Sequence, residues 1–384
     1  MKAARKRKSG EAKEKVLQIE KELNDAFLER KDVVRGLLVG LLTKQHVLLL
    51  GPPGTAKSMM ANDLCGRIGG QYFQWLLSRT STPEELFGPV SLKALENDSY
   101  RRVTTNKLPE ANIAFVDEIF KCNSAVLNTM LSVLNERVFF NDGSPMNVPL
   151  EMAVGASNEL PEDREELGAL WDRFLLRYIV GYIRDPRNFE KLLAGAGAGA
   201  AQTGLTEQDL TQARAEVAAV EIARIIPKVQ ELRQKMVELN IPVSDRRWRQ
   251  SLELVKAQAW LNGRAQATDD DLEILAAALW VEQGQIQQVR QAIMNLANPL
   301  DMEAVDLFDQ AMEVWQEAMN ANDEKATAVG TEANAKLKKI TRKLEALRQQ
   351  AEENHKSTTR IDEAITQVAE WNKEVVAKCL GITL

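Results

Sequence analysis

The chain has 384 residues, of which 45% are hydrophobic and 27% are charged, a balance typical of a globular protein with two or three domains. Its net charge of −6 provides no overall basic field that would hold nucleic acid. No apolar run approaches the ~20 residues of a membrane span, and the polar N-terminus does not resemble a signal peptide. Three scattered cysteines and two histidines disfavour disulfide and zinc sites and predict a cytoplasmic protein.

The chain begins with a basic stretch, because residues 2–8 contain five cations. We expect residues 1–14 to be a flexible, solvated tail; a nucleic-acid-binding arm is the alternative. Apolar residues at helical spacing predict helix over residues 11–45, with a second amphipathic helix beginning at Lys31. Residues 46–50 then read as a short apolar strand.

The most informative segment follows that strand and precedes another predicted helix. Its small residues allow successive backbone N–H groups to point inward, and the helix start adds a partial positive charge. Lys57 is long enough to reach the β- and γ-phosphates of a nucleotide, and Ser58 can place a hydroxyl on Mg²⁺. Ala56 stands where the pattern GxxxxGK[ST] has its last glycine. A chance turn before a core helix is the alternative. The predicted phosphate-binding residues are Gly51, Pro52, Pro53, Gly54, Thr55, Ala56, Lys57, Ser58 and Met59.

A second decisive segment is the apolar strand at 113–118, which ends in two acids. Before it lie a predicted strand at 72–77, a capped helix start at 82–85 and a loop-like stretch at 88–108. In a nucleotide-hydrolysing fold, Asp117 would hold the Mg²⁺ shell and Glu118 would polarise the attacking water. A strand ending at a solvated carboxylate is the alternative, but the preceding phosphate loop favours the functional interpretation.

Two further segments carry polar residues at the ends of predicted elements. A periodic helix at 121–136 and a hairpin at 139–149, with its turn at 141–143, lead to a strand at 151–158. This strand ends at Asn158, which could orient the attacking water or simply cap the next turn. Arg173 ends a helix just before a strand at 175–180; it is either a solvated helix-end cation or a finger inserted into a neighbouring subunit.

The Gly/Ala run around residues 194–201 is the clearest domain boundary. Everything after it reads as helical, with starts at Thr206, Pro227 and Ser244, and a fourth helix capped by Thr268 that runs past Trp280. Arg246, near a helix start, is either a second phosphate-sensing cation or a surface charge. Apolar residues at steps of three and four between 337 and 368 predict an antiparallel helical hairpin, packed on its own domain or serving as a partner-docking arm.

Taken in order, these motifs resemble those of an AAA+ ATPase, and the phosphate loop is similar to that of the MoxR family. Segments at 81–89, 125–129, 135–137, 156–161 and 243–248 resemble the family's regulatory ATPase variant A (RavA) branch. The resemblance covers about residues 15–300. It implies a P-loop αβα core with a five-stranded parallel sheet, followed by an all-α lid and a C-terminal helical hairpin or bundle. The implied boundaries are a core at 15–193, a linker at 194–205, a lid at 206–298 and a C-terminal part at 299–384.

The resemblance also implies roles for single residues. In a hexameric ring Arg173 would be the trans-acting finger and Asn158 the first sensor. Arg246 would be the second sensor, with Arg247 as the fallback, and the hairpin at 137–150 matches the pre-sensor insertion. Unlike RavA proteins, the chain shows no strand pattern after residue 300.

The implied activity is hydrolysis of ATP with Mg²⁺ in a ring that remodels or matures partner protein complexes, as a chaperone does. A von Willebrand A-domain protein is the implied partner, and the client is not encoded in any motif. Two alternatives stay open at this stage. One is a nucleotide-gated scaffold with little turnover, and the other is a DNA-stimulated motor, which the acidic charge balance disfavours.

Overall fold

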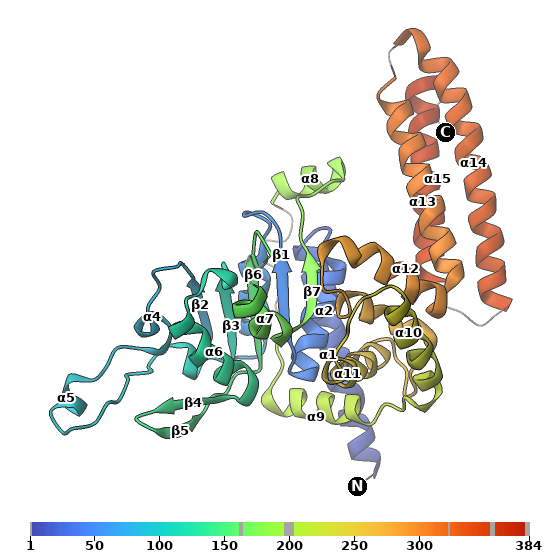
Figure 1. Cartoon of the computed structure of the whole chain (residues 1–384). Helices are drawn as coiled ribbons and strands as arrows, with labels where there is room; N and C mark the ends of the chain where they lie inside the picture. The colour runs from blue at the N-terminus through green and yellow to red at the C-terminus, as the bar shows by residue number, and fades with distance from the viewer. Residues whose placement is uncertain (1, 161–163, 196–202, 322, 354–357, 381–384) are drawn as a thin grey trace. The chain divides into compact units, whose positions relative to one another are not determined.

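The structure, a computed structural model, describes residues 2–160, 164–195, 203–321, 323–353 and 358–380 (Figure 1). The chain divides into two compact units. Unit 1 comprises residues 1–224, 243–267 and 277–279, and unit 2 comprises residues 225–242, 268–276 and 280–384. No helix among the described residues is long and apolar enough to cross a membrane.

Unit 1 is built on a parallel five-stranded sheet with strand order β2-β3-β6-β1-β7 (Figure 1). Its strands are β1 (His46–Leu50), β2 (Tyr72–Leu76), β3 (Ile113–Asp117), β6 (Met152–Ser157) and β7 (Phe174–Ile179). Every residue of β1 and β6 is buried, as expected for parallel strands covered by helices on both faces. Gly155 of β6 allows a close approach, since a Cβ there would lie 2.8 Å from the Phe174 ring. The predicted sheet is therefore present, and its carboxyl ends bring three predicted motifs to one edge.

Helices connect and cover these strands, and most lie where the sequence predicts. Residues 2–14, which the sequence analysis treats as a tail, are helical and form the start of the long first helix. This stretch is rich in Lys, Arg, Ala and Glu, all good helix formers, which favours continuous helix. The helices of unit 1 are α1 (Lys2–Ala26), α2 (Lys31–Thr43), α3 (Lys57–Arg67), α4 (Pro83–Phe87), α5 (Leu92–Leu95), α6 (Ser124–Glu136), α7 (Arg164–Arg173), α8 (Pro186–Leu193), α9 (Glu207–Ala218) and α11 (Asp245–Leu261).

The predicted hairpin is present as β4 (Val138–Asn141) and β5 (Ser144–Asn147), which form a separate antiparallel pair. Its two turn residues, Asp142 and Gly143, both have positive φ (54° and 72°), as a tight hairpin turn requires. The Asp142 carboxylate accepts hydrogen bonds from the Ser99 hydroxyl (2.6 Å) and the Tyr100 N–H (2.9 Å). The hairpin and the 88–103 segment are thus held together, on the β2 side of the sheet (Figure 1).

The segment predicted as a single lid is divided between the two units. Helices α9 and α11 pack with α1 and α2 in unit 1. Helices α10 (Ile226–Glu238) and α12 (Ile286–Ala297) belong to unit 2, as does the 3₁₀ helix η4 (Asp269–Ala277) apart from its last residue. The helix expected to run past Trp280 is instead this 3₁₀ helix, which stops at Ala277. The carbonyl of the next residue, Ala278, accepts a hydrogen bond from Arg247 (2.6 Å). The linker residues 196–202 lie outside the described residues, and the predicted domain boundaries stay a prediction.

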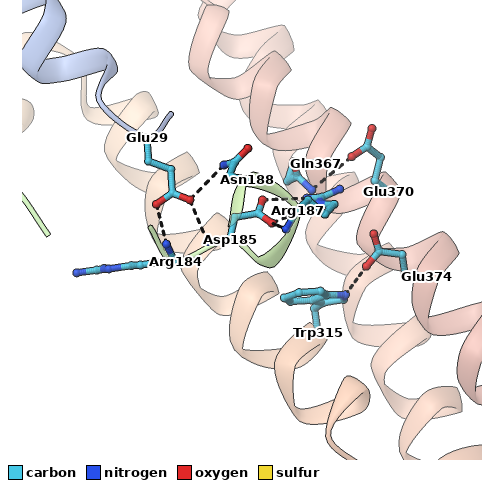
Figure 2. Close-up of polar contacts among 9 residues, drawn as sticks. All are labelled: Glu29, Arg184, Asp185, Arg187, Asn188, Trp315, Gln367, Glu370 and Glu374. Carbon is cyan, nitrogen blue, oxygen red and sulfur yellow. Dashed lines mark hydrogen bonds and ion pairs between the residues drawn. The ribbon is translucent and has the colours of Figure 1, made fainter. Parts of the chain in front are cut away.

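Unit 2 ends in a bundle of three long helices, α13 (Pro299–Met319), α14 (Asp323–Glu353) and α15 (Thr359–Leu380), which lie side by side (Figure 1). Six residues of the predicted hairpin seam are buried in the bundle core, and the seventh, Ile365, is partly buried against it. The six are Leu337, Ile340, Leu344, Leu347, Ile361 and Val368. Trp315 of α13 stacks on Trp371 of α15, with ring centroids 5.4 Å apart, and its indole N–H donates to Glu374 (2.8 Å; Figure 2). The hairpin therefore packs within its own unit, with α13 as a third helix.

Candidate active site

The phosphate loop connects β1 to α3 at the carboxyl edge of the sheet. Lys57 is buried, and its ammonium donates to the carbonyl oxygens of Gly51 (2.6 Å) and Pro52 (2.8 Å). Burial lowers the pKa of Lys57, and the nearby carboxylates of Asp117 and Glu118 oppose that shift. The side chain thus lies inside the loop and close to both predicted acids, where a cation would meet bound phosphate.

Backbone conformation explains two residues of this loop. Gly51 has φ of 147°, and a Cβ there would lie 2.0 Å from the Val180 carbonyl oxygen, so no other residue fits without a backbone shift. Ala56 has φ of 65° and ψ of 20°, the left-handed region. The residue that replaces the usual glycine therefore keeps the glycine conformation, at a cost of about 1 kcal/mol in strain.

The acidic pair lies at the end of β3, two strands from the phosphate loop in the sheet. The Oδ1 atom of Asp117 accepts a hydrogen bond from the Glu118 N–H (3.0 Å). Glu118 has φ of 52°, again the left-handed region. Non-glycine residues in that region are strained and are found disproportionately at functional sites, and this conformation turns the chain sharply after the strand.

Asn158 lies just beyond β6, which separates β3 from β1 in the sheet. Its amide donates to the Glu118 carboxylate (2.9 Å), while Lys121 forms an ion pair with the other carboxylate oxygen (3.3 Å). The Gly51 N–H also donates to the Ser157 carbonyl oxygen (3.0 Å). Hydrogen bonds therefore connect the phosphate loop, the polar tip of β6 and Glu118.

The donor set fits a nucleotide with Mg²⁺. Among the residues that the structure describes, no cluster of three His, Cys, Asp or Glu side chains could hold a metal unaided. Mg²⁺ commonly takes one or two protein oxygens together with substrate phosphates and water. The Ser58 hydroxyl and the Asp117 carboxylate would supply those protein oxygens. A cavity of about 420 Å³ adjoins Glu118; Lys121, Ser157 and Asn123 are among the other residues that line it.

Arg173 is the last residue of α7, directly before β7. Two of its guanidinium nitrogens, Nε and Nη1, are buried and have no hydrogen-bond partner among the described residues. Buried donors without acceptors are costly, and the residues that the structure describes leave these two donors unsatisfied.

The two adjacent arginines of α11 have opposite environments. Arg246 is exposed. Arg247 is buried, with 4% of its surface exposed, and it pairs with Asp172 (Nε to Oδ1, 3.2 Å). Its four other N–H groups donate to backbone carbonyls. All five donors of Arg247 are therefore used within the subunit, and the fallback assignment of Arg247 as a phosphate sensor is not supported.

Strand order and site geometry together define the class. The sheet is parallel, with a phosphate loop after β1, an acidic pair after β3 and a polar residue after β6, which lies between them. This arrangement is the core of an AAA+ ATPase. The chain matches the family described as the MoxR domain in the MoxR-vWA-beta-propeller ternary systems over residues 14–223, and an AAA lid domain over residues 224–293. It belongs to the MoxR family of AAA+ ATPases.

Several known proteins are similar over different extents. An uncharacterized protein of Methanocaldococcus jannaschii, MJ0079, is 35% identical over 94% of this chain and 97% of its own length. Chaperone MoxR1 of Mycobacterium tuberculosis is 28% identical over 42% of this chain and 43% of its own. A crystal structure of a provisionally assigned ATPase from Cytophaga hutchinsonii shares the fold, with a TM-score of 0.61, 18% identity and coverage of 77% of this chain and 96% of that one. The resemblance to the RavA branch is not among these findings and stays a prediction.

Sequence reasoning missed two features of the site. Lys121, which pairs with Glu118, had a signal in its spacing, since it stands three residues after the acid. Arg177 had none: it is a buried β7 cation whose guanidinium lies 4.1 Å from the Trp171 ring centroid and donates to the Phe174 and Trp171 carbonyls. A buried arginine inside an apolar strand shows its purpose only once its carbonyl partners are placed.

Proposed function

We propose that the protein binds ATP with Mg²⁺ at the phosphate loop and hydrolyses it to ADP and phosphate. The observation that carries the proposal is that the phosphate loop, the acidic pair and the tip of β6 lie together. Lys57 lies beside the acidic pair, and Asn158 is hydrogen-bonded to Glu118. In this arrangement Lys57 and the loop N–H groups bind the phosphates, while Ser58 and Asp117 hold Mg²⁺. Glu118 takes the proton of the attacking water, and Asn158 orients the water and the Glu118 carboxylate.

Two substitutions test this site. Glu118→Gln should retain ATP binding and reduce phosphate release by at least 100-fold, because the amide cannot accept a proton. Lys57→Ala should weaken both binding and turnover. Binding is measured with a fluorescent ATP analogue and turnover by phosphate release. Unchanged steady-state hydrolysis in either variant would refute the site.

The matched control is Glu136→Gln at the exposed end of α6. It removes the same charge from a helix of the same unit that lies outside the phosphate site. Binding and turnover should both equal those of the parent chain. Loss of turnover in this control would mean that the assay reports folding rather than chemistry.

We further propose that the chain acts as a ring, hexameric by analogy with its family, in which Arg173 reaches the nucleotide of the neighbouring subunit. The orphaned Nε and Nη1 atoms of Arg173 support this role. Arg173→Ala subunits should assemble yet hydrolyse at least 10³-fold more slowly, as removal of an arginine finger predicts. If Arg173→Ala sites gain no turnover when wild-type subunits are mixed in excess, the trans role is wrong.

The proposed task of this ring is to remodel or mature partner protein complexes in the cytoplasm, as a chaperone does. The matched family description names von Willebrand A-domain proteins alongside MoxR domains, so we propose such a protein as the partner. Co-purification of the intact chain with proteins encoded beside it tests this, with and without ATP. If no such protein co-purifies, or if the same amount co-purifies with and without ATP, the result would argue against a remodelling cycle.

One observation favours a second candidate, a nucleotide-gated scaffold with little turnover. Each carboxylate oxygen of Glu118 already has one partner, Asn158 on one and Lys121 on the other, so water must share the remaining lone pairs of the base with these two contacts. Lys121→Ala separates the candidates. A rise in turnover means that Lys121 restrains an active base, whereas ATP binding with negligible turnover in both forms supports the scaffold.

A further inference from the structure

The junction between α7 and β7 carries the finger candidate Arg173 and is fixed by two buried arginines. The helix ends at Arg173 and the strand begins at the next residue, so no loop separates them. Arg177 holds the inner side of this junction through the Phe174 and Trp171 carbonyls (3.1 Å each). The backbone around Arg173 is thus placed by side chains rather than by a turn of its own.

Arg247 holds the same junction from α11. It donates to the Asp172 carboxylate and backbone, and to the carbonyls of Phe174 and Leu175, at 3.0–3.3 Å. Four of its five donors therefore contact the residues that flank Arg173 on both sides. A rigid, planar guanidinium with several simultaneous bonds fixes geometry better than a lysine ammonium could. We call Arg247 and Asp172 the finger clamp.

Arg247 also stands next to the proposed phosphate sensor. Ser244 caps α11 by accepting from the Arg247 N–H (3.2 Å), so Arg246 and Arg247 both lie in the first helical turn. Successive helix residues point about 100° apart, which explains why one is exposed and the other buried. A displacement of this turn would move Arg247, and with it the junction that presents Arg173.

We propose that Arg247 is a positioning residue that couples the first turn of α11 to Arg173, so that phosphate bound in one subunit controls hydrolysis in its neighbour. This inference rests on the proposed trans role of Arg173 and on the phosphate-sensing role that the family resemblance implies for Arg246. Phosphate bound at a subunit's own site would attract Arg246 and move the first turn of α11. The finger clamp would pass this movement to Arg173, which then enters or leaves the site of the adjacent subunit. Among the described residues, no hydrogen bond to Nε or Nη1 of Arg173 opposes such a movement of its guanidinium.

The test measures an effect in the neighbour. Donor subunits carry Glu118→Gln, which abolishes their own turnover but leaves their finger, and they are mixed in excess with wild-type subunits. Phosphate release per wild-type subunit then reports the donor's finger. Adding Arg247→Lys to the donor should lower this rate about 10- to 100-fold, the cost of a misplaced catalytic group. The donor should bind a fluorescent ATP analogue with unchanged affinity, because its own phosphate loop is intact.

Three further donors make the result decisive. Arg249→Lys, an exposed arginine of the same helix, is the matched control and should leave the rate unchanged. Arg173→Ala should lower the rate; if it does not, the trans finger itself is wrong. If Arg173→Ala lowers the rate and Arg247→Lys does not, the clamp is refuted while the finger stands. Arg246→Ala should reproduce the Arg247→Lys loss, and an undiminished rate there would refute coupling to the sensor.

Folding is checked by melting and by size-exclusion chromatography of every donor. If Arg247→Lys fails to assemble, Asp172→Ala replaces it in the test. The Asp172 side chain is 42% exposed, and its removal leaves the buried guanidinium with four carbonyl acceptors. A loss in neighbour turnover with intact assembly supports the clamp. A well-assembled Asp172→Ala donor that sustains the full rate overturns it.

Discussion

Replacing Ala56 by glycine should stabilise unit 1, although glycine usually destabilises a folded chain. Ala56 has φ of 65°, and the left-handed conformation costs a residue with a Cβ about 1–2 kcal/mol. Glycine removes that strain but adds about 0.5–1 kcal/mol of backbone entropy to the unfolded chain. The difference predicts a gain of about 0.5–1 kcal/mol in the free energy of unfolding.

The measurement is urea unfolding without nucleotide, followed by circular dichroism. The matched control is Ala215→Gly, an exposed position within α9, where ordinary helical angles predict a loss of about 1 kcal/mol. The two variants introduce the same residue, so their shifts in midpoint should have opposite signs. If Ala56→Gly lowers the free energy of unfolding as much as the control does, the loop does not hold Ala56 in the left-handed region.

Two predictions concern pH and stability. Burial lowers the pKa of His46 to about 3. The unfolded chain therefore binds a proton near pH 6.5 that the folded chain does not bind. Between pH 7.5 and 5.5, the free energy of unfolding of wild type, measured in urea, should fall by about 1.4 kcal/mol more than that of His46→Gln. Burial raises the pKa of Asp301 to about 6 despite the opposing charge of Arg360. Its ionised form therefore destabilises unit 2 as pH rises through 6. Between pH 5 and 7.5, the free energy of unfolding of Asp301→Asn should rise by about 1.4 kcal/mol relative to that of wild type. A pH-independent difference between the two would contradict that origin.

Features encoded locally could be predicted from the sequence. The capping boxes at Thr82 and Thr206, the Asp142–Gly143 turn and the acid-tipped strand each depend on a few consecutive residues. The placement of the site followed from these, because parallel strands carry their loops to one edge. Asn158 could therefore be expected near Glu118, although the hydrogen bond between them could not.

Features that depend on distant partners could not be predicted. A 3.6-residue pattern ran past Trp280, yet η4 stops at Ala277, and the Ala278 carbonyl bonds to Arg247 from another helix. Helices α9 and α11 were grouped with the lid by sequence order, but they pack on α1 and α2. In both cases the deciding contacts join residues far apart in the chain, where local propensity carries no information.

The two arginines of α11 show this limit most sharply. In the sequence Arg246 and Arg247 are equivalent cations in one helical turn, and either could meet a phosphate. Burial separates them, since Arg247 must satisfy five donors away from water and does so with Asp172 and four carbonyls. An arginine so engaged would lose several bonds by turning to phosphate, whereas exposed Arg246 would lose few. The pair is therefore suited to divided labour, with one arginine sensing the nucleotide and the other holding the segment that acts on the next subunit.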